Sequence, residues 1–85
     1  GYRLEITADP NWLTADGVSK SYLTVKMFDP ENQPLGGHQI EYSIISGCGS
    51  IRIIQGTTDN QGVSMAEYIA GHKIGMIEIM AYNRV

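Results

Sequence analysis

The chain is poor in the residues on which metal-binding, disulfide-linked and nucleic-acid-binding domains depend. It has one cysteine, Cys48, and therefore no internal disulfide and no cysteine-based metal site. Within "SGCGS" that cysteine is either a small residue in a glycine-flanked turn, which is the usual situation of an unpaired thiol, or a reactive or cross-linking thiol. The six basic residues are scattered and the net charge is −3, which argues against a nucleic-acid partner. No apolar run approaches the roughly 18 residues of a membrane helix, so we expect no membrane contact by this domain.

Helical periodicity is also missing, and this absence points to the fold class. No stretch of about eleven residues repeats apolar side chains at the spacing of an amphipathic helix. Apolar and polar residues alternate instead, as in "YRLEITA", where Leu4, Ile6 and Ala8 share one face. The alternation recurs in "SYLTVKMF", "HQIEYSII", "SIRII", "VSMAEYI" and "GMIEIMAY". A period of two is typical of antiparallel strands that bury one side of a sheet.

Turn-forming residues separate these runs at short intervals. Asp, Asn, Gly and Pro cluster at residues 9–11, 16–17, 29–37, 47–49, 59–62 and 71–75. This spacing predicts an all-β protein, an Ig-like antiparallel β-sandwich of about seven strands. We expect residues 1–85 to form a single domain that is monomeric when isolated. Eight side chains are expected to point into its core, namely Leu23, Val25, Ile40, Tyr42, Ile44, Ala66, Ile77 and Ile79.

Two of the turns, "FDPENQPLGG" and "TTDNQGVSMAEY", are acidic and rich in amides, so they are the places to look for a metal site. A calcium loop needs several carboxylates at fixed spacing and a late Glu. The first turn offers only Asp29 and Glu31, and the second only Asp59. We therefore expect both turns to reverse the chain, and we expect no metal, no cofactor and no stabilisation by calcium.

Candidate reactive and binding residues are few. His38 and His72 each lie beside glycine in a turn and belong to no recognisable catalytic grouping, so no enzyme is expected. Trp12 and Leu13 interrupt an otherwise polar crossing. They either cover an open end of the sandwich, which the cost of exposing Trp favours, or they contact a sugar or a partner protein. The side chains available for such a contact are Trp12, Tyr22, Phe28 and Tyr82.

The order of these motifs resembles the group 1 bacterial Ig-like domain, the repeat of intimins, invasins and other bacterial surface proteins. The phrases that carry the resemblance, over nearly the whole chain, are "ADGVSKSYLTV", "DPENQPLGG", "SGCGSI", "TTDNQGVSMAEY" and "GMIEIMA". The chain departs from such repeats at Cys48, where Gly or another small residue is more usual, and it is somewhat short after Gly49. The resemblance implies an Ig-like sandwich without catalytic residues, usually in tandem and extracellular, at the bacterial cell surface.

Three functions are compatible with these features. The first is a non-catalytic spacer or stalk repeat of an adhesin, cut from a longer protein, whose ends pass at opposite poles of the sandwich into neighbouring Ig-like domains. The second is a binding module for a host protein or glycan, with Trp12, Tyr22 and Phe28 as the candidate contact residues. The third is an accessory domain of an extracellular hydrolase. We favour the first, because alternating strands and polar turns are all that it requires.

Overall fold

The computed structural model describes residues 2–83, which form six β-strands and confirm the all-β class. The strands are β1 (Arg3–Asp9), β2 (Lys20–Phe28), β3 (Ile40–Ser46), β4 (Ser50–Gln55), β5 (Val63–Ile69) and β6 (Glu78–Asn83). Each alternating run of the sequence overlaps one of them. The expected number of about seven strands is therefore corrected to six within the described residues. No helix in this part of the chain has the length and apolar character to cross a membrane.

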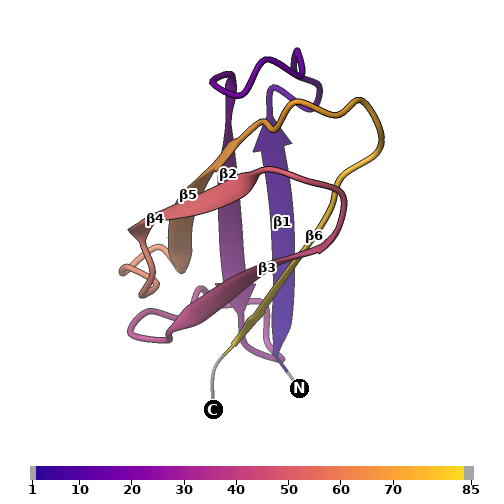
Figure 1. Cartoon of the computed structure of the whole chain (residues 1–85). Coiled ribbons are helices and arrows are strands. Elements are labelled where there is room, and N and C mark those ends of the chain that lie inside the picture. The colour runs from indigo at the N-terminus through magenta and orange to yellow at the C-terminus, as the bar shows by residue number, and fades with distance from the viewer. Residues whose placement is uncertain (1, 84–85) are drawn as a thin grey trace.

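The strands form two antiparallel sheets that enclose the core (Figure 1). One sheet has four strands in the order β1-β2-β5-β4, and the other pairs β3 with β6. The sheets approach each other where β3 meets β4 and where β6 meets β1. This arrangement is that of an Ig-like sandwich, as the sequence predicts.

Alternation along β2 and β5 places the core between the sheets. Leu23, Val25 and Met27 on β2 are buried on one face, and the register pairs Leu23 with Ala66 of β5. The predicted inward phase is confirmed for all eight residues, of which four are buried and four are half-buried and packed against them: Leu23, Val25, Ile40 and Ala66, and Tyr42, Ile44, Ile77 and Ile79.

The inner face of β1 is covered less well than that of β2. Leu4 packs against the core, but Ile6, on the same face, is 43% exposed, and Ala8 is exposed as well. The reason is the unequal width of the sheets, since two strands cannot cover four. The edge of the wider sheet therefore keeps part of its inward face in solvent.

The two acidic turns share one geometry and reverse the chain, as predicted. Asp29 Oδ1 and Asp59 Oδ1 each accept the backbone N–H groups of the second and fourth residues further along, at 2.8–3.1 Å. The third residue along is left-handed in both turns, Asn32 with φ 66° and Gly62 with φ 76°. Asn and Gly are the residues that adopt this conformation at least cost, which explains their place in the two sequences.

The loops gather at two ends of the sandwich. Residues 29–39 and 56–62 form one end, called the turn pole here, and residues 10–19 and 70–77 form the other, called the open pole. Figure 1 shows that β1 begins and β6 ends at the same end. The expectation that the chain enters and leaves at opposite ends is therefore wrong for the described residues, because an even number of alternating strands returns to its starting pole.

Candidate functional site

The open pole is built from the crossing between β1 and β2 and from the loop between β5 and β6. Asp16 organises the crossing, because its carboxylate accepts the backbone N–H groups of Val18 and Ser19 at 2.9 and 2.7 Å and the Ser19 hydroxyl at 2.6 Å. These bonds, the hydroxyl first among them, lower the pKa of Asp16 to about 2. The Gly17 N–H donates to the Gly71 carbonyl at 3.2 Å, which joins the two loops.

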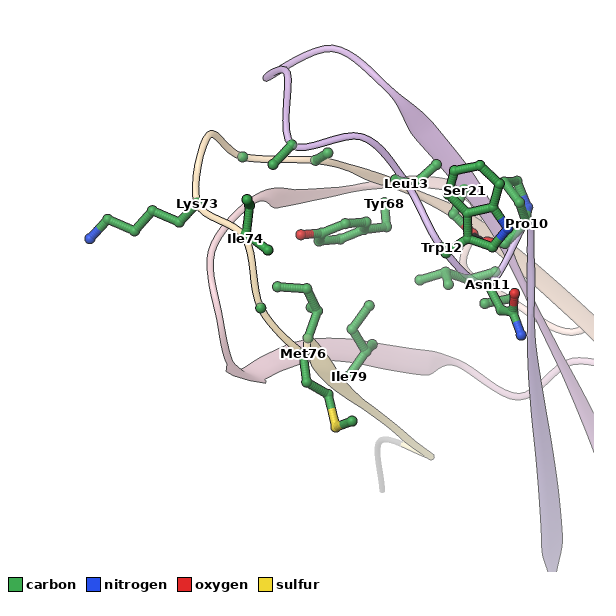
Figure 2. A pocket seen from close by; sticks show the side chains of 17 residues that line it. Pro10, Asn11, Trp12, Leu13, Ser21, Tyr68, Lys73, Ile74, Met76 and Ile79 are labelled. Carbon is green, nitrogen blue, oxygen red and sulfur yellow. Dashed lines mark hydrogen bonds between the residues drawn. The ribbon is translucent and has the colours of Figure 1, made fainter.

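An open cavity of about 490 Å³ lies between these loops, and most of its walls are apolar. Figure 2 shows the Tyr68 ring lying across the middle of the cavity, with Ile74 beside it and Trp12 at the far side. The Tyr68 hydroxyl donates to the Cys48 carbonyl, so the polar end of this side chain already has its partner. The cavity therefore offers mainly apolar surface, with Asn11 and Lys73 as polar residues in its lining.

Three large apolar side chains that line the cavity face solvent: Trp12 is 77% exposed, Met76 83% and Ile74 96%. The interpretation that Trp12 covers the open end of the sandwich is wrong. Leu13 takes that position, since it packs against the core cluster around Leu23. Trp12 is left available for an external contact.

The other two candidate contact residues lie on a different surface. Tyr22 and Phe28 share the outer face of β2 at positions about 20 Å apart. Phe28 is half-buried beneath the Arg3 guanidinium, which lies 4.6 Å from the ring centroid and also donates to the Asn32 side chain at 3.0 Å. The structure thus separates Phe28 from Tyr22, and it places Trp12 at the cavity rather than on that outer face.

Glu67 is a buried carboxylate on the face of β5 that the alternation assigns to solvent. It is 3% exposed and lies in register between Tyr22 of β2 and Arg52 of β4. Arg52 Nε donates to Glu67 Oε1 at 2.7 Å, and Lys20 Nζ lies 3.8 Å from the same oxygen. The Arg52 bond is the main reason that the pKa of Glu67 lies below its usual range. Sequence reasoning missed this ion pair, since the only sign of it is a charged residue within a central strand.

The two histidines lie at opposite poles, and Cys48 lies at the same pole as His72. His38 precedes β3 at the turn pole, whereas the His72 ring lies against Gly17 at the open pole. Cys48 is half-buried, and its Sγ lies 3.8 Å from the Lys73 carbonyl oxygen. Among residues 2–83, no three His, Cys, Asp or Glu side chains are grouped so that they can hold a metal ion. Around its cavity the open pole presents mainly apolar side chains.

Comparison with known proteins shows which family the sequence matches. A family model described as "Invasin, domain 3" matches residues 3–82, from the first strand into the last. The match includes the loops of both poles. No curated protein and no solved structure gives a match.

Proposed function

The chain belongs to the invasin domain 3 family, and from this membership we propose that it is a non-catalytic spacer domain in the stalk of a bacterial surface protein. Domains of this family are Ig-like parts of bacterial adhesin-type surface proteins. Beyond family membership, we propose a specific role for the domain outside the cell. As a module of a longer polypeptide, the domain holds its neighbours at a fixed distance and contacts one of them through the open pole.

The observation that carries the proposal is the exposure of Trp12, Ile74 and Met76 around one cavity. Large apolar side chains gathered at one end of a small domain mark an interface, because they are costly to leave in water. The domain measures 41 × 20 × 19 Å, so its end faces are small. Contact between two such ends falls toward the lower limit of the roughly 600–1,500 Å² that domains bury against each other.

The placement of the ionisable side chains supports a non-catalytic role. Asp16, Asp29 and Asp59 each use their carboxylates to bind backbone N–H groups in turns. Glu67 is bound to Arg52, and the two histidines lie at different poles. A nucleophile with a base within hydrogen-bonding reach, which acyl or glycosyl transfer requires, does not occur among the groups described above.

Trp12 is the only tryptophan, so its fluorescence reports on the open pole alone. In the isolated domain we expect red-shifted emission and ready quenching by iodide. In a two-domain protein that carries the adjoining domain, with any tryptophan there changed to Phe, we expect a blue shift and weaker quenching. Ile74→Ser should reduce that change, whereas Ile45→Ser, which alters an exposed residue of β3, should not. Emission that is the same with and without the neighbour on either side would contradict the junction role.

A binding module is the second candidate, and the exposed Trp12 is the observation that favours it. The test is a glycan array with the isolated domain and its Trp12→Ala variant, followed by titration of any glycan that binds. Saturable binding that the variant loses would replace the spacer role with recognition. A catalytic domain in the same polypeptide would instead make this domain an accessory part of an extracellular hydrolase.

A further inference from the structure

Two arginines on the outer face of the four-stranded sheet have different surroundings. On β1, Arg3 donates from Nη2 to the Asn32 side chain at 3.0 Å, and its Nη1 lies 2.9 Å from a Glu5 carboxylate oxygen. On β4, Arg52 is held through Nε alone, which donates to Glu67 at 2.7 Å. Neither of its Nη groups forms a hydrogen bond within residues 2–83, and its side chain is 66% exposed. The outer end of the Arg52 guanidinium is therefore available to an external group, whereas that of Arg3 is occupied.

Glu67 fixes the position of this guanidinium. Although Glu67 lies on the outer face of β5, it is 3% exposed, and the other residues on that face of the strand are apolar: Val63, Met65 and Ile69. A buried ion pair rarely stabilises a fold more than apolar side chains of similar size would. The Glu67 carboxylate is thus better explained by its effect on Arg52, whose Nε it holds while the Nη groups stay in solvent.

The surroundings of Arg52 carry an excess of positive charge, although the net charge of the chain is −3. Both Arg52 and Lys20 face the single carboxylate of Glu67. The register forms a row across the four strands, in the order Asp9, Tyr22, Glu67, Arg52. Asp9 is three strand spacings from Arg52, roughly 14 Å, which exceeds the Debye length of about 8 Å at physiological salt. The free end of Arg52 therefore attracts an anionic group.

We propose that Arg52, with Lys20 and Tyr22 beside it, binds a carboxylate side chain on the surface of an acidic partner protein. The Nη groups of a guanidinium match the two oxygens of a carboxylate, which they bind side by side. Tyr22 is 51% exposed, and Tyr and Arg are the residue types that contribute most at protein interfaces.

The shape of the surface favours a protein over a small ligand. Small-molecule sites are concave, and the cavity of the open pole contains none of these three side chains. They lie on the open face of a sheet, which another protein surface can approach. The inference goes beyond the spacer role and does not depend on it, because it concerns a different surface from the open pole.

The test titrates the isotope-labelled domain at low salt with the peptide acetyl-Gly-Glu-Leu-Glu-Gly-amide, and separately with the same peptide carrying Gln for Glu. The NMR signals of the Arg52 Nε–H and of the β4 and β5 amides report binding. We expect saturable binding of the Glu peptide, at least about tenfold tighter than that of the Gln peptide. Arg52→Lys keeps the charge but loses the paired Nη groups, so it should weaken binding at least about fivefold. Arg3→Lys, the matched variant on the same face, should leave the affinity unchanged.

Glu67→Gln tests the positioning role separately. Removing a negative charge beside the site should strengthen the binding of an anion if charge alone decides the affinity. If Glu67 positions Arg52, the variant should instead bind the Glu peptide more weakly. Melting temperatures of all variants show that they are folded, and the Arg52→Lys comparison stands even if Glu67→Gln does not fold.

Several outcomes would overturn the inference. Absent or equal binding of the two peptides would remove the carboxylate as the ligand. Equal losses in Arg3→Lys and Arg52→Lys would reduce the effect to general charge attraction, and tighter binding by Glu67→Gln would remove the positioning role. Tighter binding of inorganic phosphate or of glucuronic acid than of the Glu peptide would make the ligand a phosphate or an acidic sugar. Self-association of the domain that Arg52→Lys abolishes would make the partner a second copy.

Discussion

The turn pole and the open pole close the same sandwich by different means. At the turn pole, carboxylates bind backbone amides within each turn, and the two turns bind β2 and each other through backbone groups such as Met27 and Gly62. At the open pole, one loop is held in the same way by Asp16, but Trp12 and Ile74 lie in solvent around a cavity. The aspartates of the turn pole are used within its turns, whereas the open pole has apolar surface that is not used by the fold.

The difference teaches where a small domain can carry a function. Backbone hydrogen bonds at the turn pole tie the turns to β2, β3 and β5, so substitutions there act on stability. Exposed side chains of the open pole contribute little to folding and are free to serve an external contact. Substitutions at equivalent positions near the two poles should therefore differ in how much they lower the stability of the domain.

The largest effects are expected in the core under each pole. Met27 and Leu23 are both buried on the inner face of β2, Met27 toward the turn pole and Leu23 in the wall of the open cavity. Met27→Ala should lower the free energy of unfolding by about 3–5 kcal/mol and Leu23→Ala by about 2–3 kcal/mol, because the loops at the open pole can collapse into the space. Urea unfolding of both variants measures the difference. An equal or larger loss for Leu23→Ala would show that the open pole is as rigid as the turn pole.

Smaller losses of stability are expected for two glycines at the turn pole. One tests the cost of the left-handed backbone alone, and the other adds a steric collision. Gly62 and Gly37 have φ values of 76° and 80°, but a Cβ on Gly62 would lie 2.7 Å from the Met27 carbonyl oxygen, whereas a Cβ on Gly37 would meet nothing within 4 Å. Gly37→Ala should cost about 1–2 kcal/mol from the left-handed conformation alone. Gly62→Ala should cost about 1–3 kcal/mol more, from the collision. Thermal unfolding of the pair checks this, and equal losses would mean that the turns do not pack on β2.

Acid should reveal how Asp16 stabilises the open pole. Its pKa is about 2 in the folded domain and about 3.9 in an unfolded chain. The folded pKa is the lower one, so the ionised carboxylate stabilises the fold above about pH 4, and this stabilisation disappears as the pH falls toward 2. Asp16→Asn should lower the melting temperature at pH 7 and make little difference at pH 2.

Asp59→Asn at the turn pole is the matched variant, because backbone N–H groups hold the pKa of Asp59 below its usual range as well. Melting temperatures of both variants and the original domain at pH 7, 4 and 2 provide the measurement. A loss for Asp16→Asn that is as large at pH 2 as at pH 7 would mean that the side-chain shape, not the charge, holds the loop.

The strands and turns were predictable because they depend on short-range patterns. Alternation identified the inward side of β2 and β5, and the Asp-to-Gly spacing identified a turn at Asp59. The surroundings of Trp12 and Glu67 depend on distant neighbours instead. Trp12 and Leu13 are equivalent in the sequence, and only the position of the core separates them; Glu67 is buried because β4 brings Arg52 beside it. The division into four and two strands likewise follows from pairing, which alternation does not encode.

The smallest effect on stability is expected for Ile74→Ser at the open pole. Ile74 is 96% exposed, so removing its side chain takes no apolar surface out of the core, and the free energy of unfolding should change by less than about 0.5 kcal/mol. Ile77 is the matched control, because three residues further along it packs against the core cluster, and Ile77→Ala should cost about 2–4 kcal/mol. Urea unfolding with an unchanged m-value checks both. A loss above about 1 kcal/mol for Ile74→Ser would mean that loop 70–77 folds back over the cavity in solution, and the open pole would then be closed to a partner.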